Sequence, residues 1–302
     1  MNPHTIEAYA KINLGLDVIG KLPNGYHQVK MIMQSVELRD ELTLKIIEGS
    51  NVLTTDSAEL PPTEDNLILR AANLMEETYS LNGWGVRIRL RKNIPIAAGM
   101  AGGSADAAAV MRAMNVLFGL HVPDEELMAL AVSIGADVPY CILGGTALAE
   151  GIGEKLTALP PLPACHILIA KPDVSVSTKY VYEHLDSAGI RHHPDIDGSV
   201  AAIREGSLAG VLSRMENVLE SVTIPAHPVI ASIKAKMLEL GAAASLMSGS
   251  GPTVFGIFTE QAAAEYALRQ LEAAGLAKQV FLTAPCNPLK SRSTAAQSIT
   301  PL

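Results

Sequence analysis

A segment rich in glycine and alanine, residues 95–105 (PIAAGMAGGSA), has a composition suited to binding an anion. Gly99, Gly102 and Gly103 have no side chain that would keep a ligand away from the backbone. The alanine-rich run 105–118 predicts a helix that begins here and stops before Gly119. Backbone N–H groups and the positive end of the helix dipole would then face a phosphate together.

This segment alone leaves other interpretations open. Ser104 is a good capping residue, so the glycines could form a structural turn ahead of a helix. A Walker A loop would need Gly-Lys-Ser/Thr after the glycines, and none follows. The spacing G-x-x-G-G-S also differs from the dinucleotide pattern G-x-G-x-x-G. A phosphate loop and a structural turn both remain possible.

Two further polar residues stand where a ligand could reach them. Residues 5–18 alternate apolar and polar, which predicts a half-buried strand with Lys11 and Asn13 on its polar face. Asp137 lies in Gly-Ala-Asp-Val-Pro, where Pro139 is expected to hold Val138 extended. The alternatives are a solvated strand face for the first pair and a local turn for Asp137.

An aromatic pair follows a turn signal near the N-terminus. Asn24-Gly25 predicts a turn, and Tyr26 and His27 come directly after it. Such a pair is often plain surface, but it also suits a base, with one ring to stack and one imidazole to hydrogen-bond.

The elements that must position these residues alternate between strands and helices. Further strands are predicted at 36–48 (near an edge), 84–91, 146–149, 166–170 and 278–283, with a strand-turn-strand at 245–258. Helices are predicted at 64–80, 123–134, 177–185, 204–220, 226–240 and 260–274, and a loop at 187–199. The Pro-rich stretch 158–164 suggests a boundary between domains at 1–160 and 161–286, with 287–302 a disordered tail. The order in the second half suits an α+β, ferredoxin-like domain.

Composition narrows the class of protein. A length of 302 residues permits one large or two smaller domains, and hydrophobic residues make up 48 % of them. The net charge of −8, without a basic run, argues against nucleic-acid binding. Three scattered cysteines suit a reducing cytoplasm, and no cysteine–histidine spacing indicates a protein-bound metal. No apolar span predicts a membrane segment, and no obligate protein partner is inferred.

Three motifs in a fixed order give the chain a family resemblance. They are AYAKINLGLDV at 8–18, PIAAGMAGGSADAAA at 95–109 and MSGSGPTVFG at 247–256. Together they resemble the GHMP small-molecule kinase superfamily. Finer matches at 10–14, 25–27, 64–67 and 135–139 resemble a member that phosphorylates a small alcohol linked to cytidine diphosphate, in isoprenoid precursor synthesis.

The resemblance implies a two-domain α+β fold, with an N-terminal domain like domain 2 of ribosomal protein S5 and a ferredoxin-like C-terminal domain. It implies ATP as co-substrate, with Mg²⁺ bound mainly through the ATP phosphates, and Lys11 and Asp137 as the catalytic pair. The residues that would bind ATP are Pro95, Ile96, Ala97, Ala98, Gly99, Met100, Ala101, Gly102, Gly103, Ser104 and Ala105, with Asn66 and Leu67 near the adenine. Those that would bind the cytidine substrate are Asn13, Tyr26, His27, Tyr182, Gly249, Ser250 and Gly251.

The phosphate loop departs from the usual family pattern at three positions. Ala97, Ala98 and Ala101 replace glycines, and alanine adopts a positive φ less readily than glycine does. Two other functions stay open: a kinase for another small alcohol, and a nucleotide-binding regulator that keeps the fold without the chemistry. The Tyr26–His27 pair argues against the first, and intact Lys11 and Asp137 argue against the second.

Overall fold

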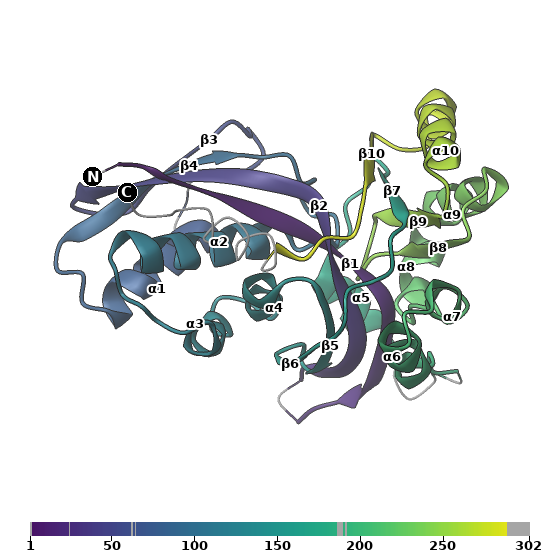
Figure 1. The fold of residues 1–302 in the computed structure, drawn as a ribbon, viewed down its shortest axis with the longest axis horizontal. Helices are drawn as coiled ribbons and strands as arrows, with labels where there is room; N and C mark the ends of the chain where they lie inside the picture. The colour runs from purple at the N-terminus through teal and green to yellow at the C-terminus, as the bar shows by residue number, and fades with distance from the viewer. Residues whose placement is uncertain are drawn as a thin grey trace, which may run out of the picture. The chain divides into compact units, whose positions relative to one another are not determined.

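The computed structural model describes residues 2–23, 25–61, 63, 65–185, 190 and 192–288. Two compact units interleave along the chain. The first contains the chain up to Ala10, Leu38–Ile96 and Ala101–Leu143, and the second contains Lys11–Glu37, Ala97–Met100 and the chain from Gly144 onward. Two long strands, β1 (His4–Lys21) and β2 (His27–Glu48), run through both units, as Figure 1 traces. The predicted division of the chain near residue 160 therefore stays a prediction.

In the first unit, β2 is an interior strand. It pairs with β1 and runs antiparallel to β4 (Trp84–Arg91), from Glu41 opposite Arg91 to Glu48 opposite Trp84. The short β3 (Val52–Thr55), which the sequence pattern did not predict, runs parallel to β4. The expectation that 36–48 lies near an edge is wrong, because strands flank it on both sides. The inward alternation predicted for β4 is confirmed at Val86, Ile88 and Leu90.

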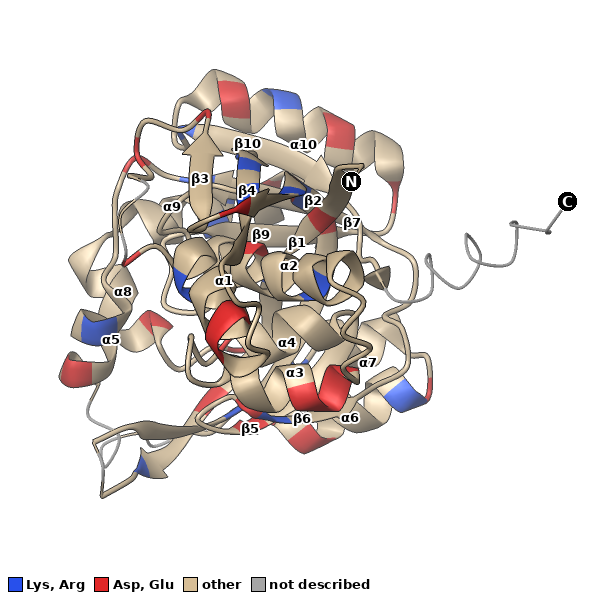
Figure 2. Ribbon diagram, turned by 90° about the vertical axis from the view of Figure 1, so that its left-hand side faces the viewer, with Lys and Arg blue, Asp and Glu red and all other residues tan. Residues whose placement is uncertain are grey.

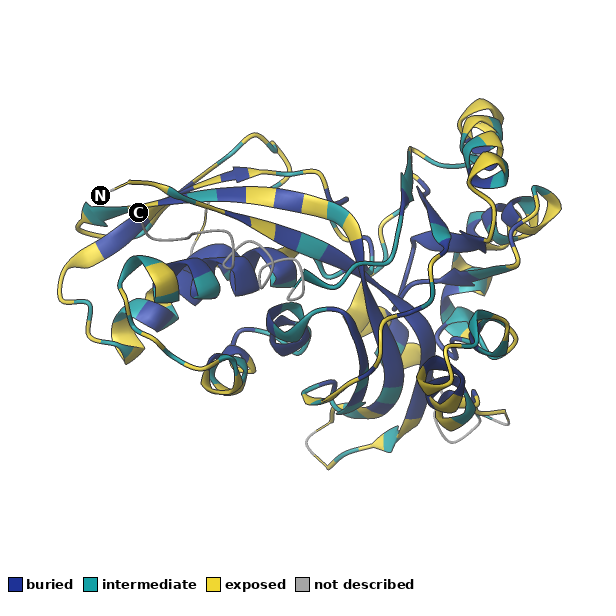
Figure 3. Ribbon diagram, in the orientation of Figure 1, coloured by how far each residue is buried: buried dark blue, intermediate teal, exposed yellow. Residues whose placement is uncertain are grey.

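Helices cover this part of the sheet. They are α1 (Leu67–Thr78), α2 (Gly102–Leu117), α3 (Asp124–Ala131) and α4 (Val138–Leu143). Helix α2 packs against α1, and its alanine run allows that close approach between two buried helix surfaces. Figure 3 shows most of α2 as buried. Acidic residues fill the first turn of α3, where they favour the helix dipole, and Figure 2 shows them in red.

Helix α4 corrects the expectation for Val138. This residue is the first of α4, not extended, and the Val138 N–H donates to the Gly135 carbonyl at 3.1 Å. Pro139 is tolerated in the first turn because the N–H that it lacks would have no partner within the helix. The local bias before a proline is therefore overridden by helix formation.

In the second unit, the first half of β2 pairs with β5 (Thr146–Gly151), which turns back into β6 (Lys155–Ala158). A second, antiparallel sheet has the order β10-β7-β9-β8, formed by β7 (His166–Lys171), β8 (Ala244–Met247), β9 (Val254–Phe258) and β10 (Gln279–Thr283). The longer helices α9 (Val229–Glu239) and α10 (Gln261–Ala274) pack on this sheet. The predicted α+β, ferredoxin-like order is confirmed.

Short helices replace the single helix expected at 204–220. After α5 (Thr178–His184), which lies within its predicted range, they are α6 (Ile196–Arg204), α7 (Leu208–Leu212) and α8 (Glu220–Ala226). The chain breaks at Gly206, where φ is 70°, and Ser207 then caps α7 by accepting a hydrogen bond from the Gly210 N–H. The predicted loop at 187–199 is wrong from Ile196 onward, where α6 begins, and 187–189 and 191 lie outside the described residues.

Aliphatic residues make up most of the core. Ala10, Ile12, Leu14, Leu16 and Val18 on β1 are each at most 2 % exposed. In the part of the chain that the structure describes, no helix combines the length and apolar character needed to cross a bilayer. Of the predicted tail, 289–302 lies outside the described residues.

Candidate active site

Lys11 and Asn13 occupy alternate positions on β1 and are almost completely buried, at 4 % and 0 % exposed. The Lys11 Nζ donates to Asn13 Oδ1 at 2.7 Å and to the Gly99 carbonyl at 3.1 Å. The Lys11 backbone N–H donates to the Met100 carbonyl at 3.1 Å. All four residues belong to the second unit. The predicted catalytic lysine thus lies directly against the middle of the predicted phosphate loop, residues 95–105.

The glycine turn 247–253 lies against the same lysine. Gly249 has a φ of 56°, and a Cβ there would lie 3.4 Å from both Lys11 Nζ and Asn13 Oδ1. The Ser248 Oγ donates to the Gly99 carbonyl at 3.0 Å. The structure therefore brings Lys11, Asn13, Gly99 and Gly249 together.

Two residues that hold this turn were not predicted. Asn217 Nδ2 donates to the carbonyls of Met247 and Gly249, at 2.9 and 2.8 Å. Thr223 Oγ1 donates to the Ser250 carbonyl at 3.2 Å. Both lie in a region predicted as one helix or a linker, so no sequence pattern singled them out. By contrast, Ser248 stands inside the recognised motif and could have been found there.

The predicted substrate residues of the same turn have their own contacts. The hydroxyl oxygens of Ser250 and Thr178 are 2.9 Å apart, and Thr178 is the first residue of α5. Gly251 has a φ of 84°, a conformation that favours glycine. A hydrogen bond between these two hydroxyl groups therefore links α5 to the glycine turn.

The phosphate loop itself uses the left-handed conformation three times. Ala97, Gly99 and Ala101 have φ values of 50°, 70° and 55°, while Ala98 does not adopt a positive φ. Ala101 is the N-cap of α2, and no side chain caps that helix end. Ser104 is the third residue of α2 and not its cap, so the reading of this segment as a turn capped by Ser104 is wrong. Uncapped amides at a helix N-terminus suit an anionic ligand such as the phosphates of ATP.

In the first unit, Asn66 and Leu67 lie beside the start of α2. Asn66 caps α1 by accepting a hydrogen bond from the Ile68 N–H at 3.0 Å. A Cβ on Gly103 would lie 3.5 Å from Leu67 Cδ1, which is ordinary van der Waals contact. The apolar Leu67 side chain therefore adjoins the helix end that would receive the phosphates.

The aromatic residues predicted for cytosine gather in the second unit. The rings of His27 and Tyr182 are 5.2 Å apart between centroids and inclined by 34°. Tyr26 is 59 % exposed, so its ring is accessible. Partial burial and, to a smaller extent, the charge of Lys21 lower the pKa of His27 below its usual value. A neutral imidazole carries one donor and one acceptor, as a cytosine edge requires.

Asp137 lies in the first unit, directly before α4, and its carbonyl accepts the Cys141 N–H at 3.1 Å. Lys11 lies in the second unit, so the predicted pairing of these two residues stays a prediction. Within the described ranges, no three His, Cys, Asp or Glu side chains gather in a way that could hold a metal ion.

Comparisons with known proteins identify the family of this chain. The model of the GHMP kinases N terminal domain matches residues 66–145, and the model of the GHMP kinases C terminal domain matches residues 199–277. The 4-diphosphocytidyl-2-C-methyl-D-erythritol kinase of Lachnospira eligens is 55 % identical over 284 residues, which is 94 % of this chain and 98 % of the relative. The enzyme of the same name from Lachnoclostridium phytofermentans is 52 % identical, over 92 % of this chain and 96 % of its own.

Solved structures give the same result. A crystal structure of 4-(cytidine 5'-diphospho)-2C-methyl-D-erythritol kinase has a TM-score of 0.80 at 32 % identity, covering 93 % of this chain and 99 % of its own. The homoserine kinase of Cytophaga hutchinsonii, with a TM-score of 0.74 and 21 % identity over 94 % and 95 % of the two chains, shares the fold. The chain therefore belongs to the GHMP kinase family, on the branch of the 4-diphosphocytidyl-2-C-methyl-D-erythritol kinases.

Proposed function

We propose that this protein transfers the γ-phosphoryl group of ATP to the 2-hydroxyl of 4-diphosphocytidyl-2-C-methyl-D-erythritol, giving the 2-phosphate and ADP. The observation that carries the proposal is the Lys11 ammonium, which is buried between Asn13 and the phosphate-loop carbonyl of Gly99. The identity to relatives named for this substrate supports the choice of alcohol.

Asp137 serves as the acceptor for the hydroxyl proton. As the substrate oxygen forms its bond to the γ-phosphorus, the bond from that phosphorus to the bridging oxygen breaks, and the proton moves to the Asp137 carboxylate. The Lys11 ammonium stabilises the charge that develops on the transferred group. Asn13, which accepts a hydrogen bond from Lys11, orients the alcohol beside it.

Residues 95–105 hold the phosphates of ATP through their backbone N–H groups and the Ser104 hydroxyl, while Asn66 and Leu67 hold the adenine. The left-handed φ values and the uncapped start of α2 support this assignment. A magnesium ion fits such a site because it is bound mainly through phosphate oxygens and water, and it would supply further neutralisation of phosphate charge. The Ser104 hydroxyl would hold a phosphate oxygen of the ATP that carries this ion.

The cytidine end is bound by Tyr26, His27 and Tyr182. Stacking of the base on aromatic rings contributes roughly 1–3 kcal/mol per contact. The proximity of His27 to Tyr182 supports a shared base-binding surface. Gly249, Ser250 and Gly251 border the substrate between its base and its reacting hydroxyl. Recognition of the distant base then orients the small alcohol for transfer.

The proposal is tested by measuring ADP release in a coupled assay with this substrate and with homoserine, mevalonate and galactose. We expect turnover with the cytidine substrate alone. Turnover with another alcohol would favour a different GHMP kinase, and a Tyr26→Ala variant with an unchanged KM for the cytidine substrate would agree with that result. Binding of ATP without turnover of any alcohol would favour a regulator without kinase activity.

We also propose that the domains divide at residues 160 and 161 and that the protein acts in the cytoplasm. The two family models fall on either side of the proposed boundary. The three scattered cysteines, Cys141, Cys165 and Cys286, suit a reducing compartment.

A further inference from the structure

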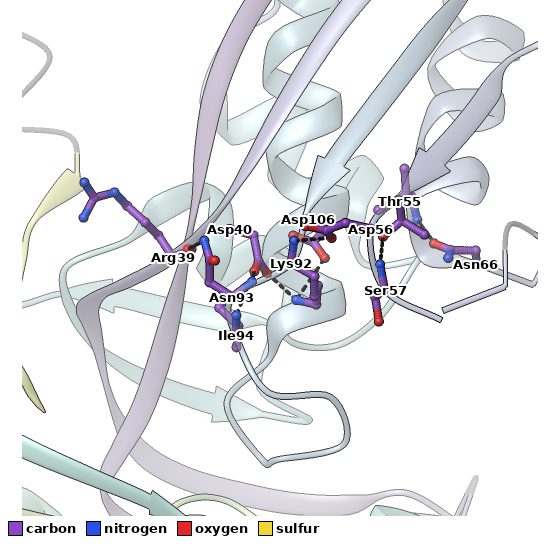
Figure 4. A network of polar contacts seen from close by, with 11 residues as sticks. Arg39, Asp40, Thr55, Asp56, Ser57, Asn66, Lys92, Asn93, Ile94 and Asp106 are labelled. Carbon is purple, nitrogen blue, oxygen red and sulfur yellow. Dashed lines mark hydrogen bonds and ion pairs between the residues drawn. The ribbon is translucent and has the colours of Figure 1, made fainter. Parts of the chain in front are cut away.

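A lysine and two aspartates form a buried network in the first unit that the proposed reaction does not use. The side chains of Lys92, Asp40 and Asp106 are 6 %, 0 % and 1 % exposed. The Lys92 ammonium forms an ion pair with Asp40 Oδ2 and lies 3.3 Å from Asp106 Oδ2. Figure 4 shows Lys92 joined to both carboxyl groups. One ammonium thus connects three separate stretches of chain.

Asp40 fixes the chain that enters the phosphate loop. Its Oδ1 accepts the N–H groups of Asn93 and Ile94, at 2.5 and 2.8 Å, and the Lys92 N–H donates to Asp56 Oδ1 at 2.9 Å. The three residues directly before Pro95 are therefore held through their backbone amides. Carboxylates that accept two amides in a buried place hold the backbone firmly.

The same ammonium contacts the helix that follows the loop. Asp106 lies in the second turn of α2, and a Cβ on Gly102, the first residue of α2, would lie 2.9 Å from Lys92 Nζ. Gly102 does not adopt a positive φ, so backbone conformation does not require glycine there. A Cβ there would crowd the Lys92 ammonium and the Ile94 side chain, whose Cγ2 would lie 3.1 Å away. Lys92 therefore connects the chain on both sides of the loop 95–101.

The charged groups of this network face one another, and their charges can balance within it. The Asp106 Oδ1 is buried and has no hydrogen-bond partner among the described residues. Burial, with only partial compensation from Lys92, raises the pKa of Asp106 well above its usual range. The facing groups are Lys92 and Asp40, with Asp56 on the Lys92 backbone. The raised pKa favours the neutral form of Asp106, which would leave one positive and one negative charge in this buried network.

We propose that Lys92 is a positioning residue for ATP, because its ammonium joins the entry of the phosphate loop to the first turns of α2. The network sets the spacing of the backbone amides that receive the phosphates. Loss of this connection misplaces the loop and weakens ATP binding, while the binding of the cytidine substrate is unaffected. The inference rests on the proposed role of residues 95–105 in binding ATP.

The first test cuts the connection at α2. Asp106→Ala removes the carboxyl and keeps a strong helix former, whereas Asp106→Asn keeps an oxygen for Lys92 and an N–H₂ group for Asp40. We expect Asp106→Ala to raise the Kd for ATP, measured by calorimetry without acceptor, by roughly 10- to 100-fold. Asp106→Asn should restore wild-type affinity. Lys45→Met, which removes an exposed charge of β2, is the control.

The second test removes the ammonium. Lys92→Met alone leaves Asp40 unpaired, so the double variant Lys92→Met/Asp40→Asn is used, because the side-chain amide oxygen that it introduces can still accept both backbone N–H groups. We expect the same loss of ATP affinity, with the KM for the cytidine substrate unchanged. The Kd for ATP is measured without turnover. This test of Lys92 therefore remains valid even if the proposed reaction does not occur.

Four outcomes would overturn the inference. The first is wild-type ATP affinity in Asp106→Ala, and the second is wild-type ATP affinity in the double variant. The third is an equal loss of affinity for ATP and for the cytidine substrate, which would indicate general damage to the fold. An Asp106→Asn variant as weak as Asp106→Ala would show that the connection to Lys92 is not the cause.

Discussion

A Cβ atom on Gly99 would lie 2.4 Å from the carbonyl oxygen of Ser248. The same atom would lie 3.0 Å from the Gly251 carbonyl oxygen, so the obstacle is backbone and not a mobile side chain. In return, the Ser248 hydroxyl donates to the Gly99 carbonyl at 3.0 Å. The predicted phosphate loop and the glycine turn of 247–253 therefore meet backbone to backbone, and this contact explains why position 99 is a glycine.

We predict that Gly99→Ala destabilises the protein more than strain in φ can explain. The left-handed conformation, with φ at 70°, costs an alanine about 1–2 kcal/mol. Overlap with the Ser248 carbonyl adds about 1–3 kcal/mol. Gly275→Ala is the matched control, because its φ is 64° and a Cβ there meets nothing within 4 Å. Urea denaturation of both variants gives the comparison, and equal losses of stability would contradict the close contact.

Asp137→Asn should lose turnover while it keeps its affinity for ATP. The amide cannot accept the hydroxyl proton, and loss of a positioned general base lowers kcat by roughly 10²- to 10⁴-fold. The measurements are kcat in the ADP-release assay and the Kd for ATP by calorimetry. Glu125→Gln, which neutralises an exposed acid on α3, is the control and should keep wild-type kcat. Turnover by Asp137→Asn near that of the control would exclude the role as base.

The elements with a clear hydrophobic period could be predicted from the sequence. Strands β1 and β4 and helices α9 and α10 lie within a few residues of their predicted ranges. The prediction of one helix at 204–220 was wrong because the apolar periodicity continues through Gly206. In the structure, the positive φ of Gly206 and the cap at Ser207 interrupt the helix there. Local conformational terms of this kind are not visible in an apolar repeat.

The candidate site was predicted unevenly for a similar reason. Lys11 and Asn13 stand in a recognisable motif, and the structure places them together. Asn217 and Lys92 belong to no recognised motif. Asn217 contacts carbonyl groups and Lys92 contacts a carboxyl group, and both kinds of partner lie far away in the chain. Residues that act by fixing other parts of the backbone are visible only after the chain has folded.

The alanines of the phosphate loop allow a prediction with a control inside the same segment. Ala97→Gly and Ala101→Gly each remove the strain of an alanine in the left-handed conformation, which costs about 1–2 kcal/mol. The added glycine also gives the unfolded chain more conformational freedom, which lowers stability by about 0.4–1 kcal/mol. Each should therefore leave stability equal or slightly higher. Ala98→Gly, at a buried position without positive φ, should lose about 1 kcal/mol. Thermal unfolding of the three variants is the measurement. If Ala98→Gly is no less stable than the other two variants, the difference in backbone conformation assigned between position 98 and positions 97 and 101 is wrong.

The final prediction concerns the protonation of His27. Partial burial and the charge of Lys21 lower its pKa, so the folded protein binds fewer protons at this site than the unfolded chain does between the folded pKa and about 6.5. Stability and cytidine binding should therefore be constant above about pH 6.5 and fall as the pH is lowered through the folded pKa, where the imidazole loses its acceptor. An NMR titration of His27 gives the pKa, and the KM for the cytidine substrate at saturating ATP gives the functional midpoint.

Substitution at Lys21 separates the two causes. Lys21→Met removes the repulsive charge but not the burial, so the His27 titration and the rise in KM should both move to higher pH. High salt should produce part of the same shift in the wild type, because screening weakens the effect of an exposed lysine. Lys45→Met, an exposed lysine of the first unit, should leave both midpoints in place. If the His27 titration moves in Lys21→Met without a matching change in KM, the His27 imidazole does not contribute to cytidine binding.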